Sequence, residues 1–164
     1  MREAWRSATQ GLTEFEAFWS PPGGLSPIVA ILLHGGGLED RTVQGLVRGT
    51  RTVWEAGDWG RRLNAPPPGE LDPRVVSSLT PDLSLVMAYA AEVADSTDAY
   101  LASLSDAEAE RLVRGHWGPT PVAALVSSAL VGHMLPHVGE VRALRGLQAR
   151  SSATVPSPPG RGRG

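Results

Sequence analysis

The residues Ala129–Leu147, ALVGHMLPHVGEVRALRGL, decide how this chain folds. His133 and His137 stand four residues apart, so on a helix their side chains lie about one turn apart on one face. At about 100° per residue both fall within an apolar stripe, and Glu140 falls close to its centre. The stripe consists of Val122, Leu125, Val126, Ala129, Leu130, Val141, Leu144 and Leu147. We therefore expect both imidazoles to face the interior, where each ring nitrogen needs a partner.

Two interpretations of this histidine pair are open from the stretch alone. Two imidazoles so placed can bind one metal ion if a third ligand comes from elsewhere in the chain. Alternatively, both are core histidines that hydrogen-bond to backbone or carboxylate groups, because a short HxxxH pattern is not specific by itself. Pro136 stands between them and cannot donate a hydrogen bond to the carbonyl of Gly132, so we expect a kink there.

The composition is that of a globular domain. Of the 164 residues, 41% are hydrophobic and 20% are charged, which allows one domain with a substantial core. The net charge of -2 implies no general attraction to nucleic acid or to an anionic membrane. There is no cysteine, which excludes disulfides, thiolate metal ligands and a cysteine nucleophile.

Export and membrane signals are not evident in the sequence. The N-terminus, Met-Arg-Glu-Ala-Trp-Arg, is charged, and no apolar run of roughly 7–15 residues follows it, which argues against a secretory signal. No uninterrupted apolar run reaches the ~18 residues that a bilayer-spanning helix needs. We therefore expect a cytoplasmic protein.

Start and stop signals divide the chain into helices and connections. Helices are expected at 2–12, 27–48, 80–103 and 121–148, with shorter ones at 53–63 and 105–113. The expected N-terminal caps are Thr13 (in a capping box with Glu16), Ser26, Thr80, Ser105 and Thr120. The expected irregular segments are a long connection over 49–72, a loop over 114–121 with an exposed His116, and a disordered tail over 149–164.

The helices account for most of the chain, and no stretch alternates apolar and polar residues for long enough to predict a strand. Four main helices with a long second connection predict an all-α fold, a four-helix bundle. We expect residues 1–148 to form this bundle as a single domain.

Glu39 falls on the apolar face of the second expected helix. A carboxylate among apolar neighbours needs a partner, so Glu39 is a candidate for orienting a metal ligand or for a buried ion pair. Arg41 and Arg142 are the cations that we expect it to reach if it turns toward a neighbour.

His34 lies in the same helix but away from that face, with Ile31 and Leu38. Because the helix is apolar on both sides, its phase alone leaves open whether His34 belongs to a site or is a partly exposed residue at a helix edge. Three glycines, Gly35, Gly36 and Gly37, follow it, and each costs a helix interior ~1 kcal/mol relative to alanine. We expect packing to preserve the helix with some local distortion, and the glycines to let a neighbouring helix or a ligand approach closely.

Two groups of these residues resemble the DinB-like family, the superfamily that includes bacillithiol transferases and the mycothiol-dependent maleylpyruvate isomerase. They are Leu33-His34 with Glu39-Asp40-Arg41, and His133-Met-Leu-Pro-His137-Val-Gly139-Glu140. The resemblance spans roughly residues 12–148, and the ending Glu140-Val-Arg-Ala-Leu-Arg-Gly-Leu-Gln148 is similar to actinobacterial members.

The resemblance implies a four-helix bundle in which His34, His133 and His137 hold one divalent metal ion. Three nitrogens plus water are the open coordination of a catalytic site, and zinc or nickel is the expected ion. The chain departs from the family pattern at the triple glycine and at Pro136. The isomerases of the superfamily have a glutamate where His133 stands, which disfavours that reaction here.

The activity that the resemblance implies is that of a metal-dependent thiol S-transferase. A bound metal would lower the pKa of a low-molecular-weight thiol, whose thiolate then attacks an electrophile. Glu39 and Glu140 are the catalytic candidates, either to orient a ligand histidine or to take a proton. Two alternatives stay open: a hydrolase with metal-activated water, and a non-catalytic bundle that acts through binding or as a homodimer.

Overall fold

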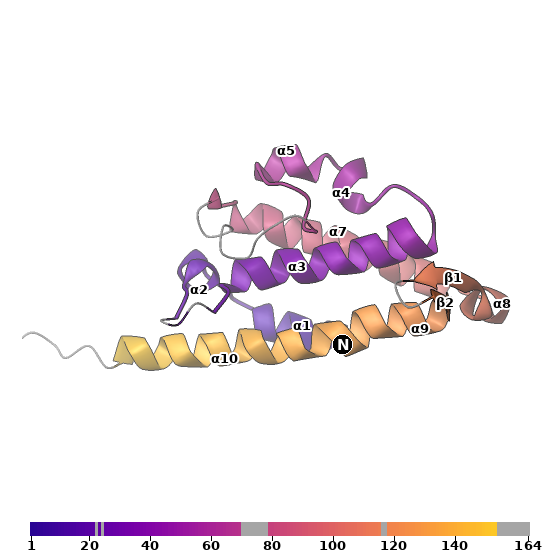
Figure 1. Ribbon diagram of the computed structural model, residues 1–164. Coiled ribbons are helices and arrows are strands. Elements are labelled where there is room, and N and C mark those ends of the chain that lie inside the picture. The colour runs from indigo at the N-terminus through magenta and orange to yellow at the C-terminus, as the bar shows by residue number, and fades with distance from the viewer. Residues whose placement is uncertain (22, 24, 70–78, 116–117, 154–164) are drawn as a thin grey trace, which may run out of the picture.

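The protein is described here by a computed structural model that defines residues 1–21, 23, 25–69, 79–115 and 118–153 (Figure 1). The long helical segments are α3 (Ile28–Asp40) continued by the π-helix η1 (Arg41–Val47), α7 (Leu83–Ala102), and the continuous run of α9 (Val122–Ser127), the π-helix η2 (Ser128–His133) and α10 (Met134–Ala153). The short elements are α1 (Arg2–Thr9), α2 (Glu14–Phe18), α4 (Val53–Ala56), α5 (Trp59–Leu63), α8 (Asp106–Glu110), β1 (Leu112–Gly115) and β2 (Gly118–Pro121).

The helices form a bundle, as the sequence predicts. Figure 1 shows α3 between α7 on one side and α9–α10 on the other, with α1 alongside α10. The short helices α4 and α5 cover α7 at one side of the bundle. Buried side chains from α3, α7 and α10 form the main core, and a second cluster joins η1 to α9.

A β-hairpin near α8 corrects the expectation of a loop over 114–121. Strands β1 and β2 pair antiparallel, with Leu112 opposite Pro121 and Gly115 opposite Gly118. Each strand has only four residues and contains glycine or proline, so the sequence offers too few positions for an alternating pattern to be visible. The helix expected to reach residue 113 accordingly ends at Glu110. His116 lies outside the described residues.

Two of the five predicted helix caps are confirmed. Thr13 and Glu16 form a reciprocal capping box, and the Ser105 hydroxyl accepts a hydrogen bond from the Glu108 amide. The other three helices begin later than expected, with Pro27, Asp82 and Pro121 at their N-caps. At Pro27 and Pro121 the proline ring fixes only φ, so ψ can remain extended and these two residues stay outside the helix.

Asp40 is a buried structural residue that the sequence analysis did not single out. Its carboxylate accepts hydrogen bonds from the amides of Val53 (2.8 Å) and Trp54 (2.9 Å) and from the Tyr89 hydroxyl (3.1 Å). These bonds fix the start of α4 against α3 and α7. The single helix expected over 53–63 is divided into α4 and α5 because Asp58 adopts a left-handed conformation, with φ of 52°.

The triple glycine in α3 lets three neighbours approach the helix closely, as the sequence predicts. A Cβ atom on Gly35 would lie 2.8 Å from the Met134 thioether of α10, and one on Gly36 would lie 3.3 Å from the ring of Tyr89 in α7. A Cβ atom on Gly37 would overlap Pro68. The helix stays α-helical through all three positions, because the packing compensates for the low helix propensity of glycine.

The last helix is longer than expected and is apolar over much of its length. It continues to Ala153 rather than ending near Gln148, and residues 154–164 of the expected tail lie outside the described residues. By length and composition, Val122–Ser151 could cross a membrane, although it contains no uninterrupted apolar run of about 18 residues. In this fold 33% of the most apolar part of this helix is buried, and most of the buried residues of the helix pack in the two core clusters.

Replacing Gly36 by valine tests whether this close packing holds the bundle together. The added side chain meets the fully buried ring of Tyr89, which cannot retreat easily because Asp40 holds its hydroxyl. We expect the free energy of unfolding, measured by urea denaturation, to fall by about 1–3 kcal/mol. The same substitution at Gly139, where a Cβ atom meets nothing within 4 Å, is expected to change it little. Equal effects at both sites would contradict this account.

Candidate metal centre

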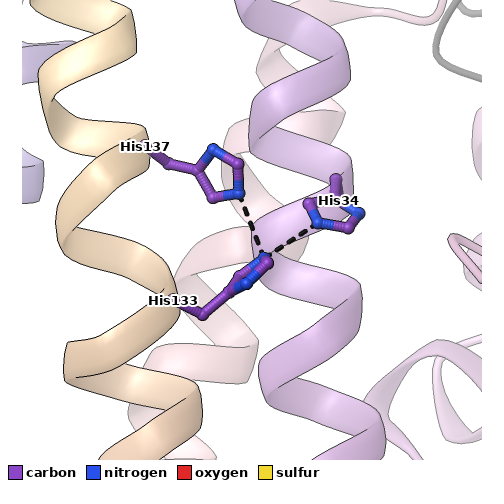
Figure 2. A group of neighbouring side chains, drawn as sticks. All are labelled: His34, His133 and His137. Atoms are coloured by element: carbon purple, nitrogen blue, oxygen red, sulfur yellow. Dashed lines mark hydrogen bonds between the residues drawn. The ribbon is translucent and has the colours of Figure 1, made fainter.

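Three histidines from two helices meet at the seam between α3 and α10. His34 comes from α3, His133 is the last residue of η2, and His137 lies one turn into α10 (Figure 2). The Nε2 atom of His133 lies 2.8 Å from Nε2 of His34 and 3.0 Å from Nε2 of His137. The three ring nitrogens all lie within 4.8 Å of one another, and all three side chains are partly buried. His34, which lies 99 positions before His133 in the sequence, therefore joins the HxxxH pair.

The arrangement of these nitrogens fits one metal ion. At Zn–N bonds of about 2.0–2.1 Å, nitrogens in a tetrahedral site lie roughly 3.3 Å apart, so small shifts of the rings would suffice. In the described part of the chain, this is the only group of three or more His, Asp or Glu side chains so arranged. With no fourth protein donor in that group, a coordination position would remain open to a small molecule.

Glu140 orients one of the three rings. Its Oε2 atom lies 2.6 Å from Nδ1 of His137, which favours a proton on Nδ1 and leaves the lone pair on Nε2 directed toward the other histidines. Glu140 itself is 55% exposed, so its outer oxygen is in contact with water. This geometry is the one expected of a carboxylate that supports a metal-binding histidine.

The exposure of Glu140 corrects its predicted place at the centre of the buried stripe, and the π-helix explains the difference. Before this wide turn the buried positions include Val126 and Leu130, and after it they include Met134, Val138 and Val141. A π-helix holds more residues per turn, so the buried stripe continues about one residue later than an ideal α-helix predicts. The two histidines consequently lie at the edge of the stripe, facing His34, and Glu140 lies beyond it. The same shift leaves Leu147 39% exposed.

Glu39 is buried as predicted, but it lies on the far side of α3 from His34. Five residues separate the two, which places them roughly 140° apart around the helix. Arg2 binds both carboxylate oxygens of Glu39, at 2.6 and 2.8 Å, in a buried ion pair. The cation is therefore Arg2 and not Arg41 or Arg142. Within the described residues no hydrogen bond joins Glu39 to a histidine, so the structure gives it a structural contact and no part in the candidate centre.

Burial and mutual proximity favour the neutral form of two of these rings, those of His34 and His133. Burial lowers the pKa of His34 below its ordinary value of 6.5, and the nearby His133, His137 and Arg41 lower it further. Burial and the neighbouring His137 likewise lower the pKa of His133, against a smaller opposing effect of Glu140. Neutral imidazoles are the form that binds metal ions.

A groove begins beside Glu140 and runs along the same seam. It encloses about 220 Å³ and is lined by Leu25, Ser26, Ile31, Glu140, Ala143, Leu144 and Leu147. None of the three histidines lines the groove, but Ile31 lies one turn before His34 on α3 and Glu140 pairs with His137, so the groove lies next to the candidate metal centre. The sequence analysis did not identify this groove, because its walls come from segments that are joined only by the packing of α3 on α10.

The fold and the histidine cluster define a helical bundle protein with a candidate three-histidine metal centre. The family model of the DinB superfamily matches residues 1–141, which include all three histidines and Glu140, so this chain belongs to that superfamily. No curated protein matches it. A solved structure described as a conserved protein from Enterococcus faecalis is similar, with a TM-score of 0.74 and 17% identity over 88% of each chain. At that identity the likeness supports the fold alone.

Changing Glu140 to glutamine tests its role beside His137. The neutral amide accepts a weaker hydrogen bond from Nδ1 than the carboxylate does, so we expect zinc affinity, measured by competition with a chromogenic chelator, to fall about tenfold. The same substitution at Glu39 is the control: it should lower stability through the loss of the Arg2 pair and leave zinc affinity unchanged. An effect on affinity at Glu39 and none at Glu140 would reverse the assignment.

The depressed pKa values of His34 and His133 predict how the metal-free protein responds to acid. The unfolded chain, with histidine pKa values near 6.5, binds more protons than the folded chain as the pH falls below that value. The contribution of these two histidines to the free energy of unfolding is therefore fully present above pH 6.5 and is lost progressively as the pH falls below that value. Urea unfolding in a chelator at pH 7.5 and 5.5 measures the loss, which should shrink when both histidines are replaced by alanine. An unchanged loss in that variant would assign it to other groups.

Proposed function

We propose that this protein is a metal-dependent enzyme that transfers a low-molecular-weight thiol to an electrophile. The observation that carries the proposal is the set of three histidine nitrogens within 4.8 Å that includes no fourth protein donor. A closed structural site would use four protein ligands, whereas an open position is what a catalytic site needs. Proteins of the DinB superfamily are typically metal-binding, which supports the same interpretation.

His34, His133 and His137 would hold the ion, and either zinc or nickel suits three imidazoles. A bound divalent ion supplies a Lewis acid that lowers the pKa of a thiol. The thiol sulfur then forms a bond to an electrophilic carbon, whose leaving group departs with its electron pair. Glu140 would keep His137 in the correct tautomer, and its exposed carboxylate supports a role in accepting the proton that the thiol loses.

The surroundings of the histidines suit a small anionic cosubstrate and an apolar electrophile. Arg41 is close enough to lower the pKa of His34, so its positive charge also favours a thiolate at this position. The groove beside Glu140 offers Ile31, Ala143 and Leu144 as apolar contacts for the electrophile. A thiol cosubstrate also fits the cytoplasmic location expected from the sequence, because thiols are kept reduced there.

The first test is the metal content of protein purified without a histidine tag. We expect about one zinc or nickel ion per chain, measured by mass spectrometry of the elements, and none in a His137→Ala variant. A metal-free wild-type protein that does not take up added ion would leave only a non-catalytic bundle.

The second test measures the transfer itself. Metal-loaded protein, mycothiol or bacillithiol, and monobromobimane should give the thioether conjugate faster than the uncatalysed reaction, and His137→Ala should remove the acceleration. Metal-loaded protein that forms no conjugate with either thiol, but cleaves model esters or amides in a His137-dependent way, would replace the transferase with a hydrolase.

A further inference from the structure

A second cavity lies on the opposite side of α3 from the histidines, among four helices. It encloses about 420 Å³, a size typical of small-molecule sites. Its walls come from α1, α3, α7 and α10 and consist of Arg2, Trp5, Arg6, Thr9, Leu32, Gly36, Glu39, Met87, Ala90, Ala91, Ala94, Asp95, Asp98 and Met134. Nothing in the proposed thiol chemistry uses these residues.

The cavity exists because α1 and α7 do not fill the space between them. On α7 the facing residues are the small Ala90, Ala91 and Ala94, and α1 packs mainly along α10. Arg2 bridges the gap at one end: its Nη2 donates to Glu39 and to the carbonyl of Ala94, and its Nε donates to Asp98. The bridge holds α1 at a distance and closes one end of the cavity.

The lining has an apolar end and an acidic end. The apolar end presents an aromatic ring, a branched chain and two adaptable thioethers, from Trp5, Leu32, Met87 and Met134. The acidic end contains two arginines and three carboxylates, so one negative charge is uncompensated; these residues are Arg2, Arg6, Glu39, Asp95 and Asp98. Glu39 and Asp98 are engaged by Arg2, whereas the carboxylate of Asp95, one turn before Asp98, is exposed and makes no hydrogen bond to any other residue that the structure describes.

We propose that this cavity binds a small organic cation with an apolar body, such as an arylalkyl ammonium. The ammonium would lie beside Asp95 and Asp98, and the apolar body would lie against the alanines and methionines with the face of Trp5 in reach. A carboxylate ligand is disfavoured because the uncompensated charge is negative.

This site is separate from the candidate metal centre. Met134 packs against Gly35 and lines the cavity, whereas its chain neighbour His133 faces His34 on the other side of the seam. The proposal therefore stands or falls without any metal bound, and it is tested on metal-free protein.

Three probes with the same ring and different charges distinguish the ligand class. Benzylamine, benzyl alcohol and benzoate are titrated into the full-length, metal-free protein and followed by ligand-observed NMR and calorimetry. We expect benzylamine to bind most tightly and benzoate most weakly. Equal binding of benzylamine and benzoate, or no binding of benzylamine, would overturn the proposal.

Two variants locate the site. Ala90→Leu fills the cavity and should weaken benzylamine binding at least about tenfold, whereas Ala102→Leu at the exposed end of α7 should not. Asp95→Asn should weaken benzylamine by about threefold and leave benzyl alcohol unchanged, with Asp106→Asn as the surface control. If Ala90→Leu does not fold, the Asp95 comparison decides alone, because a surface carboxylate does not hold the core together. Unchanged affinity in Asp95→Asn would place the cation elsewhere.

Discussion

Three consecutive glycines on α3 allow the packing on which the rest of the structure depends. The absence of side chains at Gly35, Gly36 and Gly37 lets Met134, Tyr89 and Pro68 lie against the helix backbone. A side chain at Gly35 would displace the Met134 thioether of α10, and the seam where the histidines meet is formed by α3 and α10. Glycine normally weakens a helix interior, so this segment is stable only because the neighbours that it admits are well packed.

The π-helical turn in the last helix has a complementary effect. The glycines set how close α10 lies to α3, and η2 sets which of its side chains face that seam. If the helix were regular, His133 and His137 would point into the apolar core, where neutral rings would need other partners. The extra residue in the turn moves them to the core's edge, where they are only partly buried and an ion and a small molecule can reach them. π-Bulges recur at functional sites for this kind of reason.

The carboxylates near α3 and α10 have different roles because their surroundings differ. Asp40 and Glu39 are almost completely buried and accept hydrogen bonds that join separate helices, so both serve the fold. Glu140 is exposed, and among the described residues its carboxylate makes a hydrogen bond only with the outer nitrogen of His137, so it orients that ring without joining helices. Burial, and not residue type, separates a structural acid from a candidate catalytic one.

The sequence by itself determined the helical class, the approximate positions of the long helices and the pairing of His133 with His137, whereas His34 was assigned to the cluster only through the family resemblance. Local periodicity, proline and glycine signals and the HxxxHxGE spacing are all encoded within single segments. Only the tertiary structure decided that Arg2 pairs with Glu39, that a wide turn brings Glu140 to the surface, and that β1 and β2 form a hairpin. The ion pair joins distant segments, the wide turn departs from ideal helix geometry, and the four-residue strands are too short to alternate visibly. None of the three leaves a periodic trace in the chain.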